Sequence, residues 1–123
     1  MHQQAEDKSY GSGTYRSQGL TFLEDGKAAT YVNQGAFSWD GNGGGHTGFN
    51  VRTYPDGSMT TTHYSGTSRK GEGQMVREWN GTAELVSGTG RFEGAKGHGM
   101  YSGGRYANGM GVTDWELKAV LAE

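Results

Sequence analysis

The stretch VSGTGRFEGAKGHGMYSGGRYANGMGVTDWEL, which spans Val86–Leu117, decides the fold. Its glycines recur two residues apart, at Gly88 and Gly90 and again at Gly97 and Gly99. Glycines at this spacing lie on one face of a strand and leave that face bare for a close approach. The intervening RFEGAKG holds too many glycines for a helix interior and is typical of a turn or a single helical turn. The stretch therefore predicts a strand, a tight corner and a pair of strands ending in DWEL.

Strand patterns continue on the N-terminal side of this stretch. Alternating apolar and polar residues, or runs of β-branched and aromatic residues, predict strands at about residues 13–23, 31–39, 49–54, 59–66, 74–80, 82–87, 97–106 and 111–121. Asp-Gly pairs predict hairpin turns at EDGK (24–27) and YPDGS (54–58), and Asn80-Gly81 predicts a bend. Glycine-rich or charged segments at 40–45 and 68–73 are expected to be loops, and residues 1–9 a flexible tail.

The composition is that of one folded domain. The chain has 123 residues, with 24 glycines and 7 tyrosines, and its aromatic residues are spread along its length. Disordered chains are instead poor in aromatic and β-branched residues. The absence of cysteine excludes disulfides and thiolate chemistry. A formal net charge of -2 argues against a nucleic-acid partner, which requires a basic face.

The N-terminus leaves the cellular compartment open. No apolar run approaches the roughly 20 residues of a membrane helix, so no membrane span is expected. The first residues, MHQQAEDK, lack the apolar core of a signal peptide. A cytoplasmic protein and a periplasmic or secreted domain whose signal has been removed are equally compatible with this start.

Seven to nine short strands without a long helix indicate a β-sandwich or a closed antiparallel barrel. A barrel removes exposed sheet edges, and glycines relieve crowding where its strands coil tightly. The glycine content therefore favours an all-β, closed antiparallel barrel of about eight strands, built from residues 10–123.

Residues 71–103 resemble the second half of the allene oxide cyclase-like barrel proteins, which include plant allene oxide cyclases and dirigent proteins. The matching core is Gly88–Tyr101, which reads G-T-G-x-F-x-G-x-x-G-x-G-x-Y, and the turn Asp56–Ser58 fits the same layout. The resemblance implies an eight-stranded, lipocalin-like barrel with an internal cavity. It also implies assembly into a homo-oligomer, because members are often oligomeric. Members steer the cyclisation or coupling of hydrophobic precursors or have no known role. No active-site residue of the plant cyclases is matched.

Motifs for cofactors and metals are weak in this chain. GTGRFEG lacks the βαβ unit that a dinucleotide fingerprint requires, so no cofactor is expected. His2, His46, His63 and His98 are not spaced as metal ligands, so no metal site is expected. No G-x-S-x-G elbow indicates a serine hydrolase.

Two residues are candidates for acid-base catalysis, Glu78 and His63. Glu78 shares a strand face with Val76, while Met75, Arg77 and Trp79 share the other, so neither face is clearly the inner one. An inward Glu78 would need a partner or a raised pKa, which is what a cofactor-free cyclase uses for proton transfer. His63 lies in an expected strand and offers the same chemistry.

A cavity lined by aromatic rings is the other expectation, because glycine faces leave volume that ring side chains do not fill. The candidate ligand-binding residues are Tyr31, Asn33, Arg52, Trp79 and Tyr101. Three functions stay open: a barrel that binds a hydrophobic or aromatic small molecule, a cyclase or isomerase acting on a hydrophobic precursor, and a structural or interaction barrel without a ligand.

Overall fold

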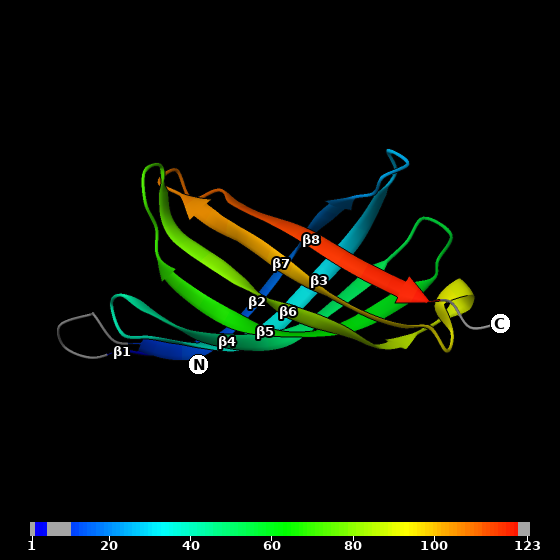
Figure 1. Ribbon diagram of the computed structural model, residues 1–123, viewed down its shortest axis with the longest axis horizontal. Coiled ribbons are helices and arrows are strands. Elements are labelled where there is room, and N and C mark those ends of the chain that lie inside the picture. The colour runs from blue at the N-terminus through cyan, green and yellow to red at the C-terminus, as the bar shows by residue number, and fades with distance from the viewer. Residues whose placement is uncertain (1, 5–10, 121–123) are drawn as a thin grey trace.

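The computed structural model describes residues 2–4 and 11–120. They form one antiparallel sheet of eight strands that pair in chain order, with a single 3-10 turn, η1 (Gly90–Phe92), between the sixth and seventh strands (Figure 1). The strands are β1 (His2–Gln4), β2 (Gly11–Phe22), β3 (Ala28–Trp39), β4 (Gly43–Thr53), β5 (Met59–Lys70), β6 (Met75–Gly88), β7 (Lys96–Tyr106) and β8 (Gly111–Val120). The predicted all-β, antiparallel architecture is confirmed.

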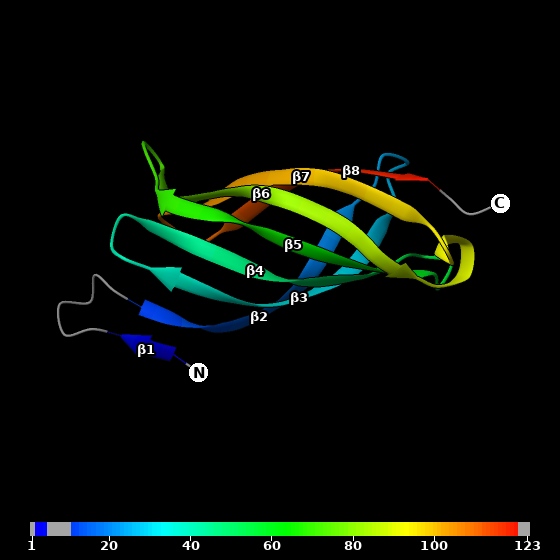
Figure 2. The same ribbon diagram turned by 60° about the horizontal axis from the view of Figure 1, so that its bottom comes forward.

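The sheet curls into a trough but does not close into a barrel (Figures 1 and 2). Within the described ranges β8 pairs with β7 alone, so the closed barrel predicted from the sequence is corrected to an open, coiled sheet. Closure requires strands whose tilt and stagger bring the two edges of the sheet together. Here β1 pairs only with Gly11–Gly13, which leaves the rest of the outer edge of β2 free, yet this edge does not pair with β8 within the described ranges. Asp114, Glu116 and Lys118 place charges along β8, which protects such an edge from pairing with other chains.

Tight turns join the long strands. Gly26 and Gly57 have φ of 84° and 87°, as the predicted Asp-Gly hairpins require. The predicted loop 40–45 is shorter than expected, because the Asp40 carboxylate accepts the N–H groups of Asn42 and Gly43 and β4 starts at once. The predicted loop 68–73 likewise begins later, since β5 runs to Lys70.

The predicted bend at Asn80-Gly81 was wrong, because β6 passes through it as one strand of 14 residues. Gly81 does not serve a turn. It pairs with Gly66 of β5 and Tyr101 of β7, and a Cβ atom on Gly81 would lie 2.6 Å from Cζ of Tyr101. The glycine therefore makes room for a ring that lies across the strand.

The corner after β6 is anchored to the turn between β4 and β5. Phe92 of η1 is buried with Leu85 and Ala95, and its ring lies 4.6 Å from that of Tyr54. Arg91 pairs with the Asp56 carboxylate at 2.9 Å, and its backbone N–H donates to Ser58 Oγ at 3.2 Å. Of the two structures predicted for this segment, a turn or a single helical turn, the helical turn is found at Gly90–Phe92, and its glycines serve packing at one end of the trough.

The predicted N-terminal tail falls mostly outside the described residues. Of its nine residues, His2–Gln4 pair as β1 with Gly11–Gly13 of β2. Among the residues described, no helix is long and apolar enough to cross a membrane.

Candidate functional site

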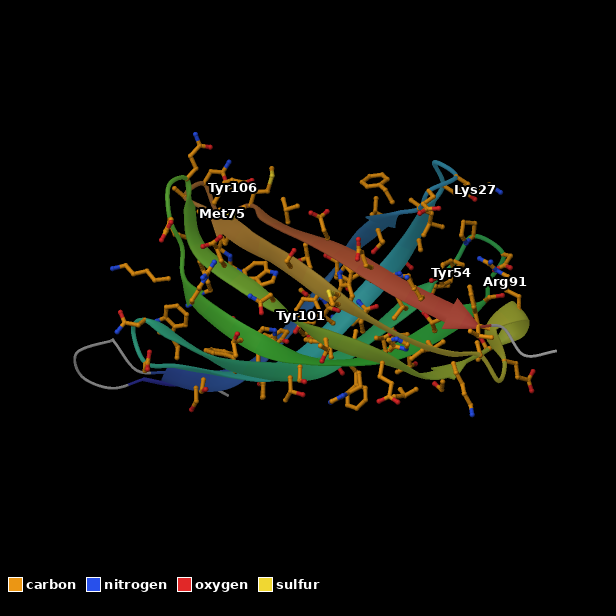
Figure 3. All side chains as sticks on the ribbon, viewed as in Figure 1. Lys27, Tyr54, Met75, Arg91, Tyr101 and Tyr106 are labelled. Carbon is orange, nitrogen blue, oxygen red and sulfur yellow. The ribbon has the colours of Figure 1, made fainter. Side chains whose placement is uncertain are left out.

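Five ring side chains gather on the concave face of the sheet, from five different strands. We call this set the aromatic cluster: Tyr15, His46, Tyr64, Tyr101 and Trp115. Tyr101 lies near the middle of the trough, between the end marked by Met75 and Tyr106 and the end marked by Tyr54 and Arg91 (Figure 3).

The rings of the cluster contact one another at mixed angles. The Tyr101 and Trp115 ring centroids are 4.8 Å apart at 31°, and Tyr64 meets Tyr101 edge-on at 5.7 Å. The His46 ring lies 5.8 Å from that of Tyr101. Such spacings are those of favourable aromatic pairs. Tyr64 and Tyr101 are each about 5% exposed or less, whereas the other rings of the cluster are half-buried.

Strand register places two glycines between each pair of polar rings. Along one row of cross-strand partners, Tyr15 of β2 and Tyr64 of β5 are separated by Gly35 and Gly48. Cβ atoms on these glycines would lie 2.6 Å from the hydroxyls of Tyr15 and Tyr64 respectively. Each ring therefore lies flat over its neighbouring glycine, and the two hydroxyls hydrogen-bond to each other above them.

A second row repeats this arrangement two strands further along. His46 of β4 and Tyr101 of β7 are separated by Gly66 and Gly81. His46 Nε2 and the Tyr101 hydroxyl are joined by a 2.6 Å hydrogen bond, and His46 Nδ1 lies 3.1 Å from Ser68 Oγ. The glycines thus set the position of both polar contacts.

Burial keeps this cluster uncharged near neutral pH. It raises the pKa of Tyr15, Tyr64 and Tyr101 above their usual value of 10.0, so all three phenols keep their protons. Burial also lowers the pKa of His46 below 6.5, so its imidazole is neutral. The bond between Tyr15 and Tyr64 uses one of their two hydroxyl protons, which leaves the other available to an acceptor on a ligand.

Four polar residues, which we call the polar belt, border the aromatic cluster on the same face: Asn33, Asn50, Thr60 and Thr62. Asn50 donates from Nδ2 to Oδ1 of Asn33 at 2.5 Å, and Thr60 and Thr62 are 3% exposed. Arg52 extends from this belt toward Trp115, with its guanidinium carbon 6.0 Å from the centroid of that ring. The concave face therefore joins an apolar, ring-lined zone to a buried polar zone.

All five predicted ligand-binding residues occur on this concave face. Tyr31, Asn33 and Arg52 belong to the end with the polar belt, and Tyr101 belongs to the aromatic cluster. Trp79 packs against the buried side chains of Tyr64, Ala83 and Tyr101, and its indole Nε1–H donates to Thr113 Oγ1 at 2.8 Å.

The two predicted catalytic residues lie on the convex face, apart from one another. Glu78 is paired with Arg69 at 3.6 Å, and its side chain is 29% exposed. His63 Nε2 lies 3.1 Å from Thr47 Oγ1, and its ring is 5.1 Å from that of Phe49. Neither side chain lies on the concave face with the aromatic cluster.

A shallow, open depression on the convex face is lined by residues that include His63, Glu84, His98 and Met100. Among the described residues no three histidine, aspartate or glutamate side chains gather as metal ligands.

Sequence reasoning missed four members of the cluster as site residues, namely Tyr15, His46, Tyr64 and Trp115. His46 was assigned to the edge of a glycine loop, yet it follows Gly43–Gly45 inside β4. The signal that could have found it is the repeat of ring, glycine, glycine and ring on four adjacent strands. That signal appears only when the strands are aligned, because the four residues are far apart in sequence.

Comparison with known proteins gave no match to a family model, to a curated protein or to a solved structure.

Proposed function

We propose that this protein binds a planar aromatic or hydrophobic small molecule on the concave face of its sheet, without turnover. The observation that carries the proposal is the pair of cross-strand rows in which glycines let rings lie flat on the sheet. No strand or helix among those described covers the half-buried rings Tyr15 and Trp115. Small-molecule sites combine apolar, aromatic linings with a few placed polar groups, and this face has both.

Binding of 2-naphthamide, a neutral and planar probe, tests the proposal by isothermal titration calorimetry. Trp115→Leu removes a ring from the concave face, and Phe49→Leu makes the same kind of change on the convex face, where Phe49 is 49% exposed. Loss of one aromatic contact is expected to weaken binding about three- to tenfold in Trp115→Leu. Phe49→Leu should bind as the wild type does. Equal affinities in both variants would refute the concave face as the site, and no binding to the wild type would favour a structural role.

A second candidate function is a cofactor-free cyclase or isomerase, with the hydrogen-bonded pair His46 and Tyr101 in place of Glu78 and His63. The 2.6 Å contact between them is short enough for proton transfer. Burial holds both groups neutral, which suits hydrogen bonding to a ligand better than proton abstraction. His46→Gln separates the two functions, because it should abolish turnover of a precursor while leaving binding of 2-naphthamide within about threefold.

Membership of the allene oxide cyclase-like group stays a proposal as well. It is supported by the glycine corner at 88–101, which here docks η1 against the turn that carries Asp56. The open edge of β8 differs from the closed barrel that the group implies. A homo-oligomer that covers this edge would reconcile the two, and sedimentation velocity would detect it.

A further inference from the structure

Arg52 is a buried cation without a counter-ion in the part of the chain that the structure describes. The residue is 8% exposed, and its Nε donor has no acceptor. The two ion pairs among the described residues involve Arg69 and Arg91 instead. A buried guanidinium is stabilised only when an anion or hydrogen-bond acceptors replace the water it has lost.

The carboxylates on the described strands are confined to one face of the sheet, whereas cations occur on both faces. Strand alternation and register place the acidic residues Glu78, Glu84, Asp114 and Glu116 on the convex face. Cations on the concave side of the described strands are Arg52 in the trough and Lys70, Arg77 and Arg105 toward one end. The concave face therefore attracts anions and has no carboxylate of its own, among the described strand residues, to neutralise Arg52.

The guanidinium of Arg52 is within reach of a molecule that rests on the aromatic cluster. Its Cζ lies 6.0 Å from the centroid of the Trp115 ring, which also packs at 4.8 Å against Tyr101. A ring stacked on the half-buried Trp115 would present a substituent on its edge to Arg52. A planar carboxylate matches the fork of guanidinium N–H groups and accepts two of them at once.

We infer that the ligand of the concave face is an aromatic carboxylic acid, whose carboxylate is held by Arg52. This inference rests on the proposed binding function and names the chemical class of the ligand. The ring of the acid lies on Trp115, which packs against Tyr101, and the carboxylate enters the polar belt beside Asn50.

The test compares 2-naphthoate with 2-naphthamide, which have the same ring and differ in charge, at about pH 7 by calorimetry. A charge-assisted hydrogen-bond pair is expected to make wild-type protein prefer naphthoate about ten- to a hundredfold. Arg52→Met should abolish this preference, because losing the guanidinium weakens the binding of naphthoate far more than the binding of naphthamide. Arg105→Met removes an exposed cation from the same face and should keep the preference, which excludes an effect of net charge alone.

The outcomes distinguish a failure of the carboxylate inference from a failure of the proposed binding function. Binding of both probes with equal affinity to the wild type, or an undiminished preference in Arg52→Met, would overturn the carboxylate and leave the binding function standing. Binding of neither probe to the wild type would overturn both.

Two further measurements test the inference if a variant does not fold well enough for calorimetry. In the wild type, the ¹H–¹⁵N resonance of Arg52 Nε should shift with naphthoate and not with naphthamide, and an unshifted resonance would contradict the inference. The ligand-free Arg52→Met protein should unfold at the same or a higher temperature, because it loses an unpaired buried charge. A clearly lower unfolding temperature would show that Arg52 already has a partner inside the protein.

Discussion

Gly81→Ala is the substitution that examines the packing of rings over glycines most sharply. The added methyl group would lie 2.6 Å from Cζ of Tyr101 and would also meet the carbonyl oxygen of Ser65. Real Cβ atoms do not approach other atoms so closely, so either the ring leaves its position over β6 or the ladder to β5 shifts. Overpacking of this kind costs about 1–3 kcal/mol.

The size of the effect converts to a measurable change in unfolding temperature. At roughly 2.1 cal/mol/K per residue, the entropy of unfolding of a chain of 123 residues is about 0.26 kcal/mol/K. Gly81→Ala should therefore lower the melting temperature by about 4–12 °C in a circular-dichroism scan. The matched control is Gly45→Ala on the convex side, where the nearest atom to the new methyl group is the Gly66 carbonyl oxygen at 3.9 Å. It should melt at the wild-type temperature or above, since alanine loses less backbone entropy on folding than glycine does. Equal melting temperatures for the two variants would refute the packing of Tyr101 over Gly81.

Three further variants test the contacts around the trough. Trp79→Phe removes the 2.8 Å bond to Thr113 and should lower the free energy of unfolding by about 1–3 kcal/mol in urea; an unchanged midpoint would count against the bond. Burial lowers the pKa of His46 below 6.5, so the contribution of the neutral imidazole to stability is complete above that pH and is lost as the pH falls further. His46→Gln should therefore lose less urea resistance between pH 7.5 and 5.5 than the wild type loses. The backbone N–H of Ser58 and the charge of Arg91 lower the pKa of Asp56 below 3.8, so stability is lost as the pH falls below that value. Asp56→Asn should therefore lose stability less steeply than the wild type in this acid range. Parallel acid-unfolding curves for the two proteins would contradict the prediction.

The strands could be predicted from sequence because their patterns are local. Asp25-Gly26 and Asp56-Gly57 fix two hairpins, and the alternation around Trp115 fixes the register of β8. The glycine corner was predicted for the same reason, since Gly90 and Gly94 have φ of 60° and 74° and mark the turn directly. Barrel closure is not local. It depends on whether the tilt and stagger of all the strands bring β8 to the opposite edge of the sheet, and the pattern of a single strand does not decide this.

Only part of the site could be predicted, because local patterns do not show which residues of distant strands come together. Tyr101 and Arg52 were among the residues expected to line a cavity, because glycine faces leave volume that ring side chains do not fill. A glycine in a strand pattern can mark a turn or a position over which an aromatic ring packs. Gly81 shows that the residue on the neighbouring strand decides which of the two occurs. His46 was overlooked because its partner Tyr101 is 55 residues away in the chain.

The measurement that tests the central claim most directly is an NMR titration of the labelled protein with 2-naphthamide. It follows the indole N–H of Trp115 on the concave face and the methyl group of Met100, which is 61% exposed on the convex face. Binding in the trough predicts a saturable shift of the Trp115 resonance while the Met100 methyl resonance stays in place. A shift of Met100 with an unmoved Trp115, or no shift of either, would contradict a ligand site on the concave face.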